Sequence, residues 1–366
     1  MSEEIIENTL SEENTEISEI SEKPSLMPGF KSVCTRLGIV MIIVFVSRIL
    51  IVALSVLIAP WLVTLDSVPY ELVNLALSAV FLYAVPMISA VFLLKHPIKS
   101  SGRNVYSKPR YFGRALAMFP AGYGVAITVR ILTMIAASFL AGTPLGDSFT
   151  ATEEAFAAPD IPTAVIMFLQ MTVMAPILEE LWFRGLVMES LRPYGNGFAI
   201  FISAILFGMT HANFDQFFYA TALGIVLGYI AVSTGSIVTT TVMHAMYNSI
   251  SAMMILLAAD ESVGDYLLET TAGREGVITP MVVVYIVWLV LVMLLVAVGV
   301  IMAIYKLIRI KRYRVPKVQT ELPAKKRWGI FFSRASVIVM LLLAAVCFMQ
   351  EAVVNLFYNM FAGSPS

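Results

Sequence analysis

The sequence has 366 residues, of which 59% are hydrophobic and 13% are charged, and its mean hydropathy is +0.85. Soluble globular proteins are about half apolar and about a quarter charged, so this composition excludes a soluble enzyme with one compact core. The formal net charge of −1 excludes a nucleic-acid-binding protein that depends on net basic charge. Two cysteines without CxxC spacing, Cys34 and Cys347, indicate neither a disulfide framework nor a zinc framework. The composition predicts a polytopic membrane protein.

The first 30 residues are acidic and rich in Ser, Glu and Asn. A signal peptide would begin with positive charge and an apolar stretch, and this segment has neither. Because such a composition buries too little apolar surface to order itself, residues 1–30 are predicted to be a disordered acidic tail. Residues 31–366 are predicted to form a transmembrane helical domain.

Apolar segments near the length of a membrane span, about 20 residues, follow one another along the rest of the chain. Nine candidates lie near residues 37–64, 72–94, 112–140, 161–191, 197–212, 217–232, 237–259, 277–304 and 335–360. The fifth and sixth are short, and the fourth is long. The predicted fold is therefore all-α, a polytopic transmembrane helical bundle with about eight or nine spans.

The loops between these segments alternate in charge. Lys and Arg lie before the first segment and dominate the loops after the second and eighth, whereas Asp and Glu dominate the loops after the first, third and seventh. Lys and Arg are retained on the cytoplasmic side of a membrane. The pattern therefore predicts a multi-pass protein of the cell membrane with a cytoplasmic N-terminus and an outward-facing C-terminus.

Eight ionisable residues lie inside the predicted spans: Arg48, Arg130, Glu179, Glu180, Arg184, Glu189, His211 and His244. Each costs about 2.5 to 3.5 kcal/mol on insertion scales, so a functional role is the first hypothesis. Arg48 and Arg130 occur singly, and we interpret them as structural arginines that are paired or extend toward the interface. The other six concentrate in the fourth, fifth and seventh segments, which makes these segments the candidate site.

The fourth segment carries two adjacent glutamates. Glu180 and Arg184 are four residues apart, share a helix face and can form an ion pair, which we interpret as a structural lock. Glu179 points about 100° away and needs a different partner. Pro176 lacks an N–H, so it loosens the helix just before the two glutamates.

Two other segments each carry a histidine with a partner one turn away. Phe207 precedes His211 in the fifth segment, and His244 precedes Asn248 in the seventh. A lone histidine in an apolar helix is more often an interhelical hydrogen bonder than a catalytic group. Counted from the nearest cytoplasmic turn at about 1.5 Å per residue, however, these side chains and Glu179 reach similar depths, which favours one shared layer.

Such a layer has the groups needed to hydrolyse an amide. A carboxylate and a histidine that share a water form a general-base pair. His244 and Asn248 can donate hydrogen bonds to the oxyanion that develops on a carbonyl. The chemistry that these residues indicate is direct attack of an activated water, without a covalent intermediate.

The motifs Glu179-Glu180-x-x-x-Arg184, Phe207-x-x-x-His211 and His244-x-x-x-Asn248 resemble the CPBP family, the CAAX proteases and bacteriocin-processing enzymes also called Abi proteins. The resemblance covers a core of about residues 161–255 and implies an intramembrane endopeptidase. It implies that Glu179 and His211 activate water, that His244 and Asn248 form the oxyanion site, and that Glu180 and Arg184 organise them. Phe207 belongs with this supporting set.

The resemblance also leaves a metal mechanism open, because the family has long been labelled as metalloproteases. Glu179, His211 and His244 could supply three zinc ligands. Zinc proteases usually place two ligands on one helical turn, as in HExxH, whereas these histidines lie on different helices. We therefore expect no cofactor and no metal, with zinc as the alternative.

Two further functions remain as alternatives. One is a non-catalytic membrane scaffold or immunity protein on the same fold, which complete motifs disfavour. The other is a proton-coupled transporter, which the lack of inverted repeats disfavours. The expected partners are membrane lipid and a peptide or protein substrate, such as a leader peptide, a bacteriocin or a lipidated peptide, and no nucleic acid.

Overall fold

The protein consists of helices joined by short connections in the part of the chain that its computed structural model describes, residues 26–101, 106–140, 143, 159–309 and 322–349. These ranges contain no strand, so the predicted all-α class is confirmed. Most of the predicted acidic tail lies outside them, and the first described helix begins at Leu26, within the last five residues assigned to that tail.

The helices divide into long apolar ones and shorter pieces. In chain order they are α2 (Leu26–Leu62), α3 (Ser67–Ser78), η1 (Ala79–Ala84), α4 (Val85–Ser101), α5 (Phe112–Leu116), α6 (Phe119–Ser138), α8 (Ile161–Leu169), η2 (Gln170–Met174), α9 (Ala175–Glu180), η3 (Leu181–Met188), α10 (Glu189–Leu191), η4 (Arg192–Tyr194), α11 (Asn196–Met209), α12 (Phe214–Thr234), α13 (Ile237–Ala258), α14 (Glu261–Thr271), α15 (Pro280–Ile308), α16 (Ala324–Phe332) and α17 (Ala335–Phe348).

Seven helices in the described ranges are long and apolar enough to cross a membrane, or eight if α16 and α17, bent by 67°, count as one span. The polytopic helical bundle is thus confirmed. Of the nine predicted segments, the fifth forms α11, which has only 14 residues. At 1.5 Å per residue it is about 21 Å long, less than the hydrocarbon thickness of about 30 Å. It is therefore too short to count as a span, and the ninth segment, which forms the 14-residue α17, counts only together with α16.

Helices α11 and α12 form a hairpin whose turn is residues 210–213. Asn213 caps α12, because its side chain accepts a hydrogen bond of 2.7 Å from the Gln216 backbone N–H. The two helices approach closely at Gly224, where an added Cβ would lie 3.0 Å from the Cα of Ala204. Small residues at such contacts let helix backbones pack directly in a membrane. The hairpin places His211 at its tip.

The helix Ile161–Tyr194 is one continuous span with two wide turns of π type, η2 and η3. The Ala175 N–H donates to the Gln170 carbonyl five residues back, which is the π register. The next donor in that register would be Pro176, whose nitrogen carries no hydrogen. The carbonyl of Met171 is therefore left for a partner outside the helix, and Glu179 and Glu180 lie between the two wide turns.

The start of this helix is tied to a neighbouring span. Asp160 caps α8 by accepting a bond of 2.9 Å from the Thr163 backbone N–H, and it also accepts a hydrogen bond from the Ser67 hydroxyl at the start of α3. Because these bonds stabilise the carboxylate, they lower the pKa of Asp160. The cap fixes the ends of two spans relative to each other.

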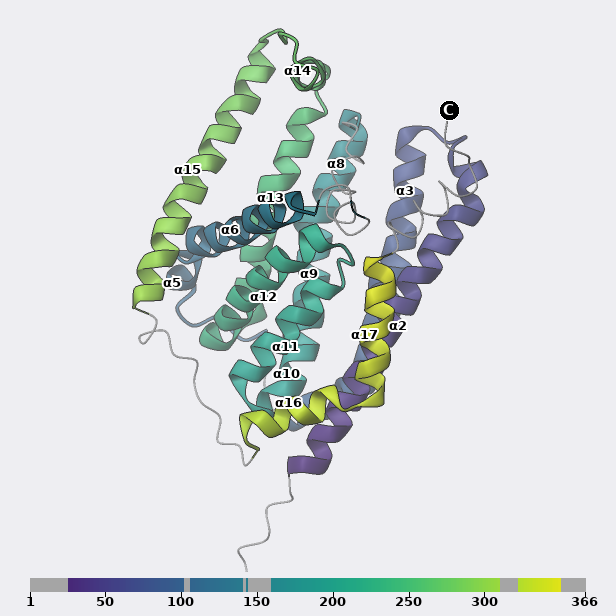
Figure 1. Ribbon diagram of the computed structural model, residues 1–366, viewed down its shortest axis with the longest axis vertical. Coiled ribbons are helices and arrows are strands. Elements are labelled where there is room, and N and C mark those ends of the chain that lie inside the picture. The colour runs from purple at the N-terminus through teal and green to yellow at the C-terminus, as the bar shows by residue number, and fades with distance from the viewer. Residues whose placement is uncertain (1–25, 102–105, 141–142, 144–158, 310–321, 350–366) are drawn as a thin grey trace, which may run out of the picture.

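Apolar clusters of buried side chains lie in different parts of the bundle, and two of them are large. The larger one includes Met41 and Phe45 of α2, Phe183 of the Ile161–Tyr194 helix and Phe207 of α11. The other joins α6, α12, α13 and α15. Helix α17 packs beside α2, so that the first and last described helices lie side by side, while α15 forms the opposite edge (Figure 1). The described motifs lie between these two edges.

Candidate active site

Glu180 and Arg184 form a buried ion pair. The Arg184 Nη1 lies 2.8 Å from Glu180 Oε1, and the two side chains are 1% and 0% exposed. Arg184 also donates from Nη2 to the Gly224 carbonyl at 3.3 Å, and its guanidinium lies over the Phe207 ring at 4.7 Å. These contacts join the Ile161–Tyr194 helix to α11 and α12. The pair therefore has the geometry of the structural lock that the four-residue spacing predicts.

His244 on α13 lies between the two glutamates. Its Nδ1 is 3.0 Å from Glu180 Oε1, and its Nε2 is 3.7 Å from Glu179 Oε2. The Phe207 ring meets both His244 and His211 edge-on, with centroids 5.6 and 5.2 Å away. Phe207 thus packs against both histidine rings.

Glu179 differs from Glu180 in exposure and in partners. Its side chain is 17% exposed, and Oε1 accepts a hydrogen bond of 3.2 Å from the Tyr83 hydroxyl. Tyr83 belongs to the π segment η1 of the second span. The separate partner that Glu179 needs is thus supplied by Tyr83 and His244. Nothing in the sequence pattern pointed to Tyr83, because tyrosine is common in apolar helices.

His211 has one ring nitrogen occupied by the backbone. Its Nδ1 lies 3.1 Å from the Phe207 carbonyl oxygen, which can only accept, so Nδ1 carries the hydrogen. In the neutral ring Nε2 is then the basic nitrogen, the one that can accept a proton or orient a water. The one-turn spacing between Phe207 and His211 sets this tautomer.

The turn that carries His211 is held by Arg48 of α2. The Arg48 Nη1 donates to the Thr210 carbonyl at 3.1 Å, and Nη2 donates to the His211 carbonyl at 2.9 Å. Arg130, the other single arginine, pairs with Asp215 through contacts of 3.2 and 3.1 Å at the start of α12. Both arginines are therefore paired, as the sequence interpretation expected, but Arg48 is bound to the backbone of a candidate site residue.

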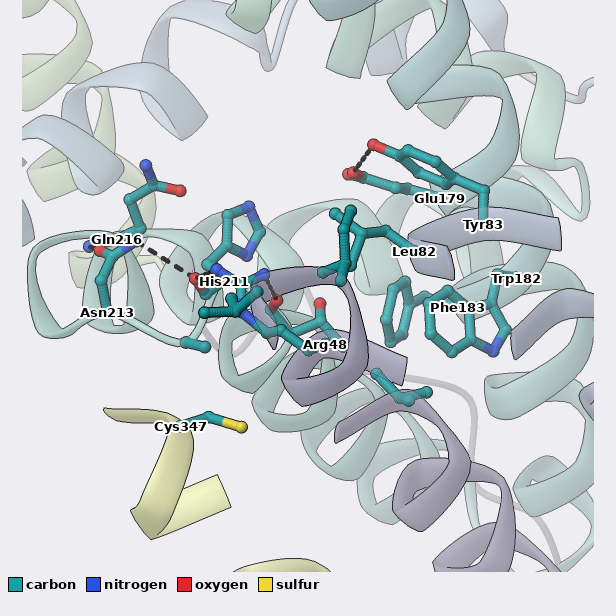
Figure 2. A pocket seen from close by; sticks show the side chains of 15 residues that line it. Arg48, Leu82, Tyr83, Glu179, Trp182, Phe183, His211, Asn213, Gln216 and Cys347 are labelled. Carbon is teal, nitrogen blue, oxygen red and sulfur yellow. Dashed lines mark hydrogen bonds between the residues drawn. The ribbon is translucent and has the colours of Figure 1, made fainter. Parts of the chain in front are cut away.

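A cavity of about 460 Å³ brings Glu179 and His211 to a common space. Tyr83 and Glu179 lie on one side of it, and His211 lies on another with Asn213 and Gln216 (Figure 2). Apolar side chains such as Leu82 and Phe183 complete the walls. Pockets of this size that combine apolar walls with a few polar groups are typical ligand sites.

The other predicted residues are not part of the cavity wall. Asn248 donates from Nδ2 to the Met171 carbonyl at 2.9 Å, the carbonyl that the π turn and Pro176 leave without an intrahelical donor. His244, Glu180 and Arg184 lie behind Glu179. The structure thus brings Glu179 into contact with His244 and onto one cavity with His211, whereas Asn248 contacts the helix backbone nearby.

Zinc ligation requires three side chains that converge on one point. Among the residues that the structure describes, no group of three or more His, Cys, Asp or Glu side chains has that arrangement. The Phe207 ring packs against both His211 and His244, and the two nitrogens of His244 already face the two glutamates. The alternative set Glu179, His211 and His244 therefore does not fit a metal in this conformation.

Comparison with known proteins points to membrane peptidases. Residues 161–250 match the family model described as type II CAAX prenyl endopeptidase Rce1-like. A protein of Bacillus subtilis (strain 168) named "Putative membrane peptidase YdiL" is 30% identical over 121 residues, which are 32% of this chain and 48% of that protein. The chain therefore spans about half the length of this curated relative. No solved structure matches significantly.

The matched residues contain all three motifs and the helices that carry them. The long helix with the glutamate pair, the hairpin with His211 and most of α13 all fall within residues 161–250, whereas Arg48 and Tyr83 fall outside. The motifs, the family match and the relative agree that residues 161–250 are similar to the CPBP family of CAAX proteases and bacteriocin-processing enzymes.

Proposed function

We propose that this protein is an intramembrane endopeptidase, in which Glu179 and His211 activate a water for direct attack on a peptide bond. One observation carries the proposal. A carboxylate held by Tyr83 and a histidine whose Nδ1 is bound to a carbonyl line the same cavity. A carboxylate and a basic imidazole nitrogen that reach one water are a general-base pair.

The reaction proceeds in two steps. Glu179 accepts a proton from the water while His211 Nε2 orients it, and the hydroxide oxygen bonds to the carbonyl carbon. The carbonyl becomes a tetrahedral oxyanion. The C–N bond then breaks, and the proton on Glu179 passes to the leaving amine, so that an acid and an amine are released. The carboxylate returns to its starting state without a covalent intermediate.

The oxyanion needs hydrogen-bond donors near Glu179. His244 Nε2 lies 3.7 Å from Glu179 Oε2 and is the nearest candidate. Because Nδ1 already donates to Glu180 Oε1, the proposal requires the imidazolium form of His244, in which Nε2 also carries a hydrogen. Asn248 lies one turn further along α13, and its amide has two N–H bonds, of which one reaches the Met171 carbonyl. The His244 and Asn248 side chains both turn toward the substrate carbonyl when substrate enters. Glu180 and Arg184 hold His244 in place.

The substrate proposed is a peptide or protein segment that reaches the cavity within the membrane. The matching family is described as type II CAAX prenyl endopeptidases. For this chain, a leader peptide, a bacteriocin or a lipidated peptide are the candidate classes. We place the protein in the cell membrane with its N-terminus in the cytoplasm. Loops rich in Lys and Arg alternate with loops rich in Asp and Glu, and this orientation puts the basic loops on the cytoplasmic side.

The test compares wild type with Glu179→Gln and His211→Ala in reconstituted vesicles. Membrane peptides from a strain that lacks the gene serve as substrate, and new termini are identified by mass spectrometry. Loss of the carboxylate or the imidazole should lower cleavage at least about 100-fold. Glu261→Gln, the same chemical change on an exposed residue of α14, is the control and should cleave normally. Full cleavage by folded Glu179→Gln and His211→Ala would contradict the proposal.

A further inference from the structure

The turn between α11 and α12 has backbone groups that its own helices cannot satisfy. The last carbonyls of a helix lack intrahelical partners, and the hydrocarbon supplies no water to replace them. In this turn the Thr210 and His211 carbonyls accept from Nη1 and Nη2 of Arg48, at 3.1 and 2.9 Å. One planar guanidinium thus binds two successive carbonyls (Figure 2).

The same turn contains a strained backbone position. Ala212 has a φ of 53°, in the left-handed region that non-glycine residues rarely adopt. Asn213 adds a bond of 3.2 Å from Nδ2 to the His211 carbonyl, so that carbonyl accepts from two side chains. A conformation of this kind persists only when its surroundings hold it, and such positions concentrate at functional sites.

The turn determines where the His211 ring lies. The ring is fixed at Nδ1 by the Phe207 carbonyl, one turn back in α11, and at its backbone by Arg48. Release of the backbone end would let the ring move relative to Glu179 on the cavity wall. A displacement of about 1 Å in a catalytic group can cost about 100-fold in rate.

We propose that Arg48 is a positioning residue for the reaction, which fixes the His211 turn and makes α2 part of the catalytic unit. The inference rests on the proposed function for its kinetic consequence, but the contact itself does not depend on that function. Arg48 lies outside residues 161–250, so the matched family core would be incomplete without this helix.

The chemistry of the side chain makes the proposal specific. A guanidinium presents several donors in one plane, whereas a lysine ammonium is a single point charge on a flexible stem. Arg48→Lys keeps the charge but cannot bind both carbonyls in the same way. Arg48→Ala removes charge and donors and leaves space beside the cavity, which Arg48 lines.

The kinetic test uses Arg48→Lys, Arg48→Ala and the matched control Arg130→Lys. Arg130 also makes two hydrogen bonds, but it makes them to the Asp215 side chain and not to the His211 turn. We expect kcat to fall about 100-fold in Arg48→Ala and less in Arg48→Lys, with KM within about twofold. Guanidinium ion added to Arg48→Ala should restore part of kcat, because it supplies the same planar set of donors. If folded Arg48→Ala has an unchanged kcat while Glu179→Gln is inactive, the positioning role of Arg48 is wrong and the proposed function still stands.

A second measurement needs no substrate. Diethyl pyrocarbonate modifies imidazole nitrogens, and mass spectrometry gives the rate at His211 and at His244 separately. Release of the turn in Arg48→Ala should raise the rate at His211 several-fold and leave His244 unchanged. Equal rates in wild type and Arg48→Ala would overturn the positioning role. Absence of cleavage by wild type, together with a changed His211 rate, would instead refute only the proposed function.

Discussion

Two adjacent glutamates have different environments, and their contacts suggest different roles. Glu180 is fully buried against Arg184 and His244, whereas Glu179 is 17% exposed and lines the cavity with Tyr83. The difference follows from the helical period, because neighbouring residues point about 100° apart. One face of the helix therefore meets α12 and α13, and the next meets the cavity.

Separate substitutions of Glu179 and Glu180 should show that one residue is needed for cleavage and the other for stability. Glu180→Gln leaves the Arg184 charge buried without its carboxylate, which typically costs about 3 to 5 kcal/mol. We expect a clearly lower thermal midpoint for Glu180→Gln in detergent, measured by tryptophan fluorescence. Glu179→Gln should unfold near the wild-type midpoint and lose cleavage. The reverse pattern would show that the assignment of the two glutamates is wrong.

A substitution at Tyr83 can remove a single oxygen atom beside the Glu179 carboxylate. Tyr83→Phe removes the hydroxyl that donates to Glu179 Oε1 and keeps the ring. Because a donor that orients the base is lost, we expect kcat to fall about tenfold, equivalent to about 1.4 kcal/mol. Tyr70→Phe, on the exposed part of α3 in the same span, is the control. If Tyr83→Phe and Tyr70→Phe have the same turnover number, Tyr83 does not contribute to catalysis.

A metal chelator distinguishes the water mechanism from the zinc alternative. The proposed reaction uses Glu179 and His211 without a metal, so prolonged dialysis against a strong chelator should leave turnover unchanged. Zinc added afterwards should have no activating effect. Turnover that disappears with the chelator and returns with zinc would establish the metal mechanism through Glu179, His211 and His244.

At the scale of elements, wide helical turns flank the candidate residues. Segment η1 carries Tyr83, and η2 and η3 lie on either side of α9, which carries both glutamates. Segments of this type occur mostly as single turns and often at functional sites. In η2 the wide register and Pro176 together free the Met171 carbonyl for Asn248.

Pro176→Ala tests the importance of this register. Alanine restores an N–H, which lets η2 return to the α register and turns α9 relative to α8. We expect a thermal midpoint equal to or above that of wild type, since a proline inside a helix is unfavourable. Cleavage should fall at least about tenfold, because a misplaced catalytic group costs rate. A stable variant with full cleavage would show that the wide turn is dispensable.

The sequence predicted the elements well and the contacts between them only in part. Apolar length located the helices, and loop charge suggested their order across the membrane. The shortness of α11 was visible, but its hairpin with α12 was not, since both segments were read as spans. Wide turns have no distinct apolar period, so η1, η2 and η3 could not be anticipated.

For the candidate site, motif spacing indicated the faces that Glu180 shares with Arg184 and Phe207 with His211, and the structure contains both contacts. Arg48 was interpreted as a structural arginine, and its attachment to the His211 turn could not be inferred because 162 and 163 residues separate the bonded pairs. Tyr83 was missed for the same reason. Long-range contacts between apolar helices depend on packing, which single-chain periodicity does not encode.

At the scale of the whole molecule, α2 contributes beyond the residues that match the family. It is packed against α17 on one side and carries Arg48 toward the α11–α12 hairpin on the other. The contacts that hold His211 therefore come from both inside and outside residues 161–250. A fragment restricted to the matched residues would contain every motif residue but would lack Arg48 and Tyr83.

The length of α2 links this arrangement to the thickness of the bilayer. Its apolar part, residues 37–62, extends about 39 Å, beyond a hydrocarbon core of about 30 Å. A helix with such hydrophobic mismatch tilts or deforms the lipid around it. Because Arg48 lies in the middle part of α2, a change in tilt acts on the His211 carbonyl. Turnover in vesicles of short, medium and long acyl chains should therefore vary with thickness, and Arg48→Ala should flatten that dependence. If wild-type turnover stays constant across the series, membrane thickness does not act through α2.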